Sequence, residues 1–306
     1  MNLQNKVISD IRAVDMPFDF EHEDNTWGKY GITEVPLLVR ADNGEVFDDK
    51  AFKGIFQDGK YRKIVGRNYI VFPNEEVDLI VTKLVEQYKD EYGIYLFKSH
   101  YARNSDIKFW ELRTESSKFQ KAIEGSKISN DVVNVGLIIR NSLGAGVSFG
   151  ADLFTFRQVC TNGAIARGKD LGNLKIKHYG QNALEEMVNS LERRLGDMLW
   201  EGMDLLKYYE RMTQLKMKQE LAEKLGNTFA KKYLPEYIVI NEDKAKKLKP
   251  EIVLTNEGKS MTLWNTFNHI TDPVWHNEHT RFNTKSYMTT TLHKLMFEEV
   301  DKEALK

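Results

Sequence analysis

The sequence is poor in the features that mark exported, membrane-embedded and disulfide-bonded proteins. It has one cysteine among 306 residues, which excludes an internal disulfide framework and is typical of a reducing cytoplasm. No apolar run approaches the roughly 20 residues that a membrane helix needs. Its first ten residues lack the basic-then-apolar pattern of a secretion signal. We therefore expect a cytoplasmic protein with no membrane contact.

The chain also lacks an excess of either charge. The 44 Lys and Arg side chains face 45 Asp and Glu side chains, which gives a net charge of −1. A nucleic-acid role must therefore depend on local separation of charge. Residues 15–24 and the tail from Glu298 are acidic, whereas residues 60–67 and 157–177 are basic with few acids. Each such run, taken alone, is equally typical of a solvated surface.

What the sequence does contain is the pattern of a mixed globular fold. Its hydrophobic content of 41% and aromatic content of 11% are typical of a folded protein with a sizeable core. Strands are expected at residues 32–39, 45–47, 63–72, 94–101, 107–113, 132–140 and 147–159. A helix is expected over residues 75–91, with Asn74 as its N-cap and Gly93 as its end. Short connections predict an α+β fold, with an antiparallel or mixed sheet and helices on one face.

A long helix with heptad spacing is expected after the last of these strands. Apolar residues recur in alternating steps of four and three from Leu184 to Met212. One helix lying across the sheet explains this pattern, and so does a helix hairpin or an oligomer contact. The C-terminal part is expected to be mostly helical, with a break at Pro273. The predicted division is an acidic arm at 1–30, an α+β core with the long helix at 31–226, and a helical extension at 227–306.

Five short pieces of the sequence occur in an order that is informative. They are Val65–Tyr69, Ile138–Ser142, Arg157–Gly163, Lys177–Asn182 and Leu263–Thr271. This order resembles the phage/plasmid-like protein family, also called domain of unknown function 932. The resemblance implies a mobile-element or virus setting and brings no established chemistry. Family members often carry an Asp-Gly-Ser-like turn after the Asn-Ser pair, but this chain has Leu143-Gly144-Ala145-Gly146 there.

The sequence offers few signs of metal or cofactor chemistry. His269, His276 and His279 lie within a short window, but no cysteine accompanies them and the zincin pattern is absent. Polar loop histidines are the commoner explanation, although the sequence leaves open whether these three bind a metal. We expect no cofactor and lean towards a protein that is not an enzyme.

Catalytic groups are equally hard to assemble from the sequence. Cys160 ends an apolar strand, so a buried structural role is expected, with a catalytic thiol as the alternative. Asp106, Glu111 and Asp152 lie on or beside expected strands, and a nuclease would need the fold to bring them together.

The best-supported constellation is a surface for single-stranded nucleic acid, because basic residues interleave there with aromatic ones. The candidate contacts are Arg62, Lys63, Arg67, Tyr69, Arg157, Asn162, Arg167, Lys169, Lys175, Lys177, His178 and Asn182. The opposing interpretation is a solvated surface of Lys and Arg with the tyrosines in the core.

The sequence therefore predicts a sequence-independent single-stranded nucleic-acid-binding protein of a phage, virus or plasmid. Strand annealing or recombination is its expected role, with a homo-oligomer as a further expectation. The alternative is a structural or host-interaction protein without nucleic-acid contact, and a third option is a nuclease or hydrolase.

Overall fold

The computed structural model describes residues 27–40, 44–102, 106–126, 131–157, 163–166, 173–180, 182–241, 250–277, 280 and 282–305. Its strands are β1 (Ile32–Arg40), β2 (Val46–Gln57), β3 (Lys60–Gly66), β4 (Ile94–Tyr101), β5 (Ile107–Thr114), β6 (Gln120–Ala122), β7 (Val132–Ser142), β8 (Phe149–Arg157), β9 (Gly163–Ala166), β10 (Asn173–Ile176), β11 (Ile238–Asn241) and β12 (Glu251–Leu254). Its α-helices are α1 (Asn74–Tyr92), α2 (Ala183–Gln214), α3 (Gln219–Thr228), α4 (Asn256–Ser260), α5 (Leu263–His276) and α6 (Phe282–Ala304). Short 3-10 turns lie at Gly28–Tyr30, Ser117–Phe119 and Lys231–Tyr233.

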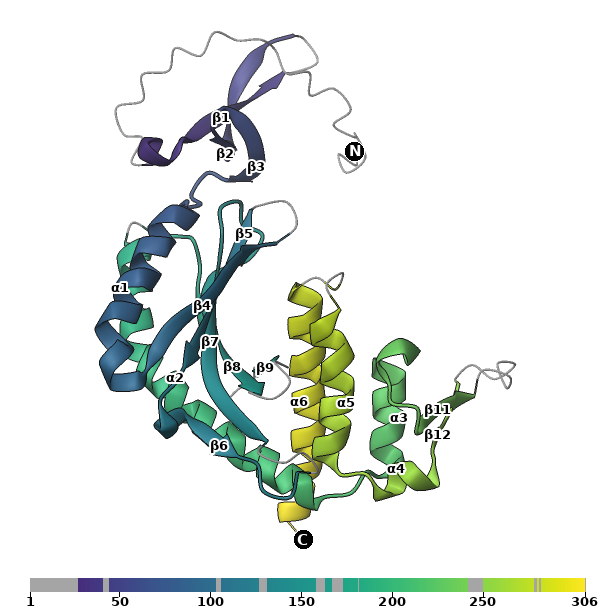
Figure 1. Ribbon diagram of the computed structural model, residues 1–306. Coiled ribbons are helices and arrows are strands. Elements are labelled where there is room, and N and C mark those ends of the chain that lie inside the picture. Colours follow the sequence, from purple (N-terminus) through teal and green to yellow (C-terminus); the bar gives the residue numbers. More distant parts are fainter. Residues whose placement is uncertain are drawn as a thin grey trace.

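The centre of the molecule is a large antiparallel sheet in the order β10-β8-β7-β5-β4, with β6 beside β7 and β9 beside β8. The alternation predicted for β5 is present. Trp110 and Leu112 face α1 and α2 and join the main core, whereas Phe109 joins a separate cluster on the other face. Figure 1 shows α1 and α2 covering one face, while α5 and α6 stand on the other side near β9. The expected α+β class, antiparallel sheet and helical C-terminal part are confirmed.

The long heptad helix is α2, and its apolar seam is filled from within the chain. Leu191, Leu195, Leu205 and Met212 are fully buried in the main core. Gly202 packs against the sheet so closely that an added Cβ would overlap Val135 and lie 2.9 Å from Leu153 Cδ1. At Gly202 the helix α2 therefore lies directly on the sheet, whereas Tyr209, nearer its end, packs on Trp264 of α5 at 4.9 Å between ring centroids. The seam offers no open surface for an oligomer.

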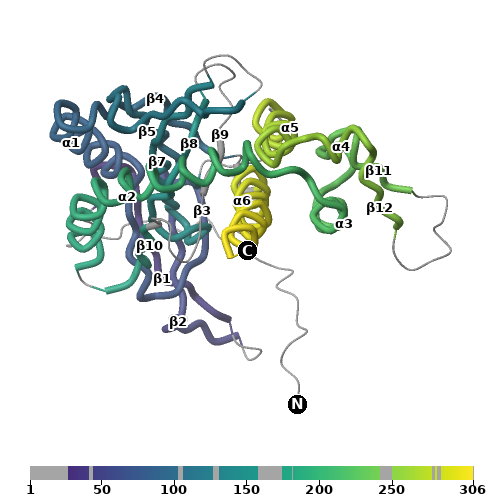
Figure 2. The backbone as a smooth tube through the Cα atoms, turned by 90° about the horizontal axis from the view of Figure 1, so that it is seen from below, coloured from purple at the N-terminus to yellow at the C-terminus, as the bar shows by residue number. Residues whose placement is uncertain are grey.

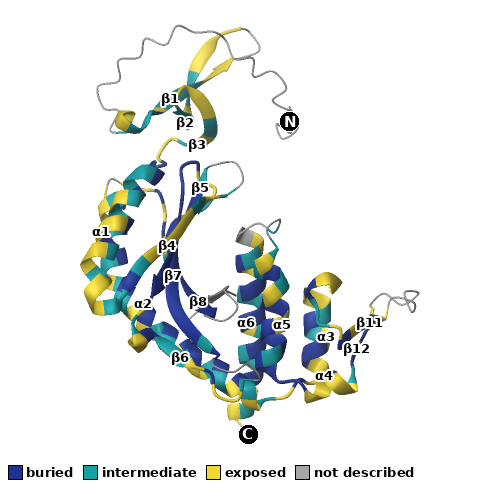
Figure 3. Ribbon diagram, viewed as in Figure 1, coloured by how far each residue is buried: buried dark blue, intermediate teal, exposed yellow. Residues whose placement is uncertain are grey.

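A second, three-stranded sheet in the order β1-β2-β3 stands at one end of the molecule. Its inner face contributes Ile32, Ile55 and Val65 to a small core completed by Tyr69 and Leu143. Figure 3 shows that much of the rest of this sheet is exposed, in contrast to the buried strands β7 and β8.

The C-terminal part packs α5 and α6 against α2, with α3, α4 and the β11-β12 hairpin beyond them (Figure 2). Residues on both sides of position 226 share one hydrophobic cluster, so the domain boundary there stays a prediction. Most of the predicted acidic arm lies outside the described residues. Within the described part of the chain, no helix combines the length and apolar character needed to cross a membrane.

Two local predictions need correction. Pro273 does not break the C-terminal helix, because α5 continues through it to His276. Asn74 is not a capping residue. It is the first residue of α1, and its side-chain oxygen accepts a hydrogen bond from Asn141 Nδ2 at 2.9 Å. That bond ties the start of α1 to β7.

Candidate nucleic-acid interface

The ends of the two basic segments, far apart in the sequence, meet in the structure. Tyr69 and Tyr179 form an antiparallel β-bridge, and Ile70 N–H donates to the His178 carbonyl at 2.8 Å. The hairpin β2-β3 delivers the first segment to this junction, and β10 delivers the second immediately before α2 begins. We call this meeting point the junction, defined by Tyr69, Ile70, His178 and Tyr179.

His178 is the central residue of the junction. Its ring stacks on Tyr69 and on Phe72, with centroids 4.9 and 4.3 Å away. Its Nε2 accepts from Phe149 N–H at 3.1 Å, so Nδ1 carries the proton and donates to the Ile70 carbonyl at 3.1 Å. Burial lowers the pKa of His178 to about 4. The ring is therefore neutral at pH 7 and holds the two segments together.

Three of the predicted contact residues serve the fold and have almost no exposed surface. Tyr69, Arg157 and His178 are 3%, 5% and 2% exposed. The Tyr69 hydroxyl donates to the Ser142 carbonyl at 2.9 Å, and burial raises the pKa of this tyrosine. Arg157 Nε donates to Asp131 at 2.6 Å. Since a strand laid on the surface cannot reach these groups, the prediction that they contact it directly is corrected.

Other predicted contacts lie on the surface near the junction. Lys175, Lys177 and Asn182 are exposed, and Arg62 is half-buried. Lys63 lies 3.8 Å from Asp106, and Arg67 lies 2.9 Å from Asp48, with both cations more than 40% exposed. Exposed pairs of this kind contribute about 0–1 kcal/mol, so a phosphate can replace either acid. Asn162, Arg167 and Lys169 lie outside the described residues, as do Cys160 and His279.

The outer face of the β1-β3 sheet carries an exposed row of aromatic side chains. Gly66 pairs with Phe52, and a Cβ at Gly66 would lie 3.8 Å from the Tyr179 hydroxyl, so Tyr179 reaches the face that Phe52 occupies. Phe56 follows on the same face and meets Tyr61 edge-on at 5.8 Å. Phe52, Tyr61 and Tyr179 are 47%, 58% and 54% exposed. We call Phe52, Phe56, Tyr61 and Tyr179 the aromatic row.

Sequence reasoning missed the two phenylalanines of this row. Tyr61 and Tyr179 stand out because each lies among basic residues. Phe52 and Phe56 lie in a strand without such neighbours, and only the register of β2 against β3 places them on the same face. The phenylalanines at positions 52 and 56, an even number of residues apart in a strand, were the available sign that both lie on one face.

The acidic residues considered for a nuclease do not gather into one site. Glu111 accepts from Arg113 Nε at 2.8 Å and lies 3.2 Å from Lys98 Nζ. Asp152 pairs with Arg140, and Asp106 with Lys63. Each carboxylate is thus neutralised by a cation. Among the residues that the structure describes, no group of three or more His, Cys, Asp or Glu side chains can hold a metal ion.

The histidine window on α5 has ordinary protein contacts. His276 Nε2 lies 3.4 Å from Asp272 Oδ1, one helical turn away, and both side chains are more than half exposed. His269 packs on Tyr237, with ring centroids 5.8 Å apart. The two described histidines of the window therefore face different neighbours.

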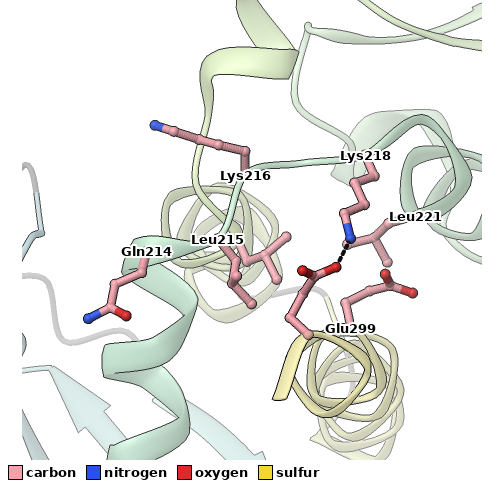
Figure 4. Close-up of a pocket in the computed structure, with 8 residues that line it drawn as sticks. Gln214, Leu215, Lys216, Lys218, Leu221 and Glu299 are labelled. Carbon is pink, nitrogen blue, oxygen red and sulfur yellow. Dashed lines mark hydrogen bonds and ion pairs between the residues drawn. The ribbon is translucent and has the colours of Figure 1, made fainter. Parts of the chain in front are cut away.

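A hollow of about 170 Å³ lies where α2 ends beside α3 and α6 (Figure 4). Three of its four charged groups are ion-paired, and the fourth, Lys216 Nζ, donates to the Ser260 carbonyl at 2.9 Å. Lys218 bonds Glu303, and Glu299 accepts from Lys302 Nζ at 2.6 Å. Burial alone would raise the pKa of Glu299, but the nearby cations Lys302, Lys224 and Lys218 lower it. The hollow therefore lies between helices, and both of its carboxylates are already matched by cations.

The fold and the surface together define an α+β protein with a protruding three-stranded sheet and an exposed aromatic and basic face. The chain belongs to the family described as Domain of unknown function (DUF932), whose sequence profile matches residues 62–295. No curated protein gives a significant match. No solved structure does so either.

Proposed function

We propose that this protein binds single-stranded nucleic acid without sequence preference, in the replication, annealing or recombination of a phage, virus or plasmid, in the cytoplasm of the host cell. The observation that carries the proposal is the junction. It places Tyr179 against Gly66 at the end of β3, so β10, with Lys175 in it and Lys177 directly after it, leads to the sheet that carries Phe52, Lys60, Tyr61 and Arg62.

The side chains on this face are of the kinds that bind single-stranded nucleic acid of any sequence. Every base has a π-face, so bases stack on exposed aromatic rings with about 1–3 kcal/mol each and with little dependence on sequence. In this proposal, cations near the aromatic row contact the phosphates between stacked bases. This local arrangement is compatible with a net charge of −1, because acids and bases are separated along the chain.

One observation favours the alternative of a protein-protein contact. The distal ends of β1 and β2 expose Leu38, Val39, Val46 and Phe47, each at least 37% accessible. An apolar tip of this kind is typical of a protein-binding surface. If the protein forms a homo-oligomer, this tip is the better candidate, because the seam of α2 is occupied.

The aromatic row can be tested with a double substitution, Tyr61→Ala with Tyr179→Ala. Affinity for a labelled single strand of mixed sequence is measured by fluorescence anisotropy at constant salt. Loss of two stacked bases should weaken binding by at least about thirtyfold. Tyr287→Ala is the matched control, because Tyr287 lies on α6 and is 68% exposed. Equal affinities of the double variant and the wild type would refute the role of the row, and no binding by the wild type would refute the function.

A further inference from the structure

The outer face of the β1-β3 sheet is apolar beyond the aromatic row. Gly54, in the middle of this sheet, pairs with Val35 of β1 and with Ile64 of β3. A Cβ added at Gly54 would lie 3.2 Å from the Phe56 ring and 3.6 Å from Leu37 Cδ2. Because paired residues point to the same side of a sheet, these apolar side chains share one face with the aromatic row. The inner face holds the small core, so this sheet is apolar on both faces, and an exposed apolar face of this size is typical of a contact surface.

Cations border the same face. Lys60 and Arg62 flank Tyr61 in the sequence, and Lys50 lies two residues before Phe52 on β2. Both lysines are exposed. A segment that fits this surface therefore carries aromatic or apolar side chains together with carboxylates.

Residues 15–24 of the chain, outside the described part of the structure, have this composition. They read Asp-Met-Pro-Phe-Asp-Phe-Glu-His-Glu-Asp, with five acids and no Lys or Arg. Phe18 and Phe20 alternate with acids, so this stretch, when extended, presents rings about 7 Å apart on one side and carboxylates on the other. A single nucleic-acid strand shows the same alternation of flat rings and anionic groups.

This acidic stretch is attached close to the sheet. Trp27 packs on the small core and stacks on Tyr30, with ring centroids 6.4 Å apart. The Gly31 carbonyl accepts from Asp58 N–H, which lies in the β2-β3 turn, at 2.8 Å. Residues 15–26 extend at most about 40 Å, whereas β1 is about 30 Å long. The stretch therefore reaches the aromatic row, and its short tether gives an effective concentration of about 1 mM.

We propose that residues 15–24 bind the outer face of the β1-β3 sheet of their own chain and compete there with a nucleic-acid strand. Phe18 and Phe20 take the places of stacked bases on the aromatic row, and the carboxylates take those of phosphates beside Lys50 and Lys60. The contact itself needs no nucleic acid, whereas the competition rests on the proposed function. Because a strand must displace this stretch before it binds, the contact lowers the apparent affinity for the strand.

Cross-linking of the full chain with a water-soluble carbodiimide tests the contact. The reagent joins a carboxylate to a lysine amine that it touches, without a spacer, and peptide mass spectrometry identifies the joined residues. The reaction is run at low salt without nucleic acid. We expect links from residues 15–24 to Lys50 and Lys60.

Lys83 is the matched control for chance encounters. It is exposed on α1, roughly 10 Å along the helix from Glu76, which accepts from the Tyr30 hydroxyl. The tethered stretch therefore reaches Lys83 as well. Links to Lys83 should be rarer by about fivefold or more, because only the tether brings the stretch there.

Phe18→Ser/Phe20→Ser separates a specific contact from general attraction between charges, because it keeps all the acids. It should lower the links to the two lysines by about fivefold, since two stacked rings are lost. It should also tighten the binding of a labelled single strand by about tenfold, the ratio of an effective concentration of about 1 mM to a dissociation constant of about 0.1 mM. Val7→Ser/Ile8→Ser, outside the acidic stretch, is the control and should change neither quantity.

Two results would overturn the contact. One is that links to Lys50 and Lys60 are no more frequent than links to Lys83. The other is that the links occur only in cross-linked dimers, which would assign the stretch to a second copy of the chain. Equal strand affinities of Phe18→Ser/Phe20→Ser and the wild type would overturn the competition. Failure of the proposed function is seen separately, because the cross-linking uses no strand.

Discussion

Acid should weaken this protein through His178, the residue that joins the two basic segments. Its pKa is lowered from 6.5 to about 4 by burial between Tyr69 and Phe72. The unfolded chain therefore binds one more proton than the folded chain between these two values. The contribution of neutral His178 is complete above pH 6.5 and is lost as pH falls towards 4.

The size of this effect follows from the two pKa values. Between pH 7 and pH 5 the free energy of unfolding should fall by about 2 kcal/mol through this residue alone. His178→Gln removes the titrating group while keeping a donor and an acceptor for the Ile70 and Phe149 backbone. The variant should be less stable than the wild type at pH 7, and the gap should shrink by about 2 kcal/mol at pH 5.

Urea denaturation followed by circular dichroism at pH 7, 6 and 5 measures this gap. His269→Gln is a suitable control, because that side chain is exposed on α5. A gap that stays constant across the three pH values would show that His178 does not titrate as a buried neutral ring. The account of the junction would then be wrong.

Two further predictions concern α2. Gly202→Ala should lower the free energy of unfolding by about 1–3 kcal/mol, because the added Cβ overlaps Val135 and this outweighs the helix preference of alanine. Chemical denaturation measures this change, and an increase in stability would contradict the observed packing. Leu191→Asp and Leu205→Asp should each unfold the monomer by burying an unpaired charge, seen as loss of the helical circular-dichroism signal. Smaller but folded species in light scattering would instead show that the seam is an oligomer contact.

Much of the fold could be predicted because it depends on local pattern. The alternation of β5 and the heptad spacing of α2 state which side of each element is buried. The end of α1 at Gly93 was predictable for the same reason. Gly93 has a φ of 62°, and glycine adopts this left-handed conformation without steric cost, which is why it often ends a helix. What fills each buried face was not predictable: the seam of α2 is equally regular whether a sheet or a second helix covers it.

The candidate site was only partly predictable for a different reason. Lys175 and Lys177 are on the surface as a basic run suggests, but Arg157 has the same charge and is buried on Asp131. This ion pair could not be predicted from the sequence, because Asp131 lies 26 residues before Arg157 and meets it only through the pairing of β7 with β8. The sequence predicted His178 as a surface contact. Its burial was not predictable, because its aromatic neighbours Tyr69 and Phe72 come from a segment more than a hundred residues earlier in the sequence.

The salt dependence of strand binding tests the central claim most directly. Affinity for a labelled single strand is measured over a range of salt concentrations for the wild type and for Lys175→Ala/Lys177→Ala. The account predicts weaker binding to all sequences and a salt slope reduced by about 1.4, the value for two lost phosphate contacts. Lys83→Ala/Lys89→Ala removes the same charge from the exposed side of α1 and should leave the slope unchanged. Parallel lines for the wild type and the first variant, with equal affinity at low salt, would contradict the claim.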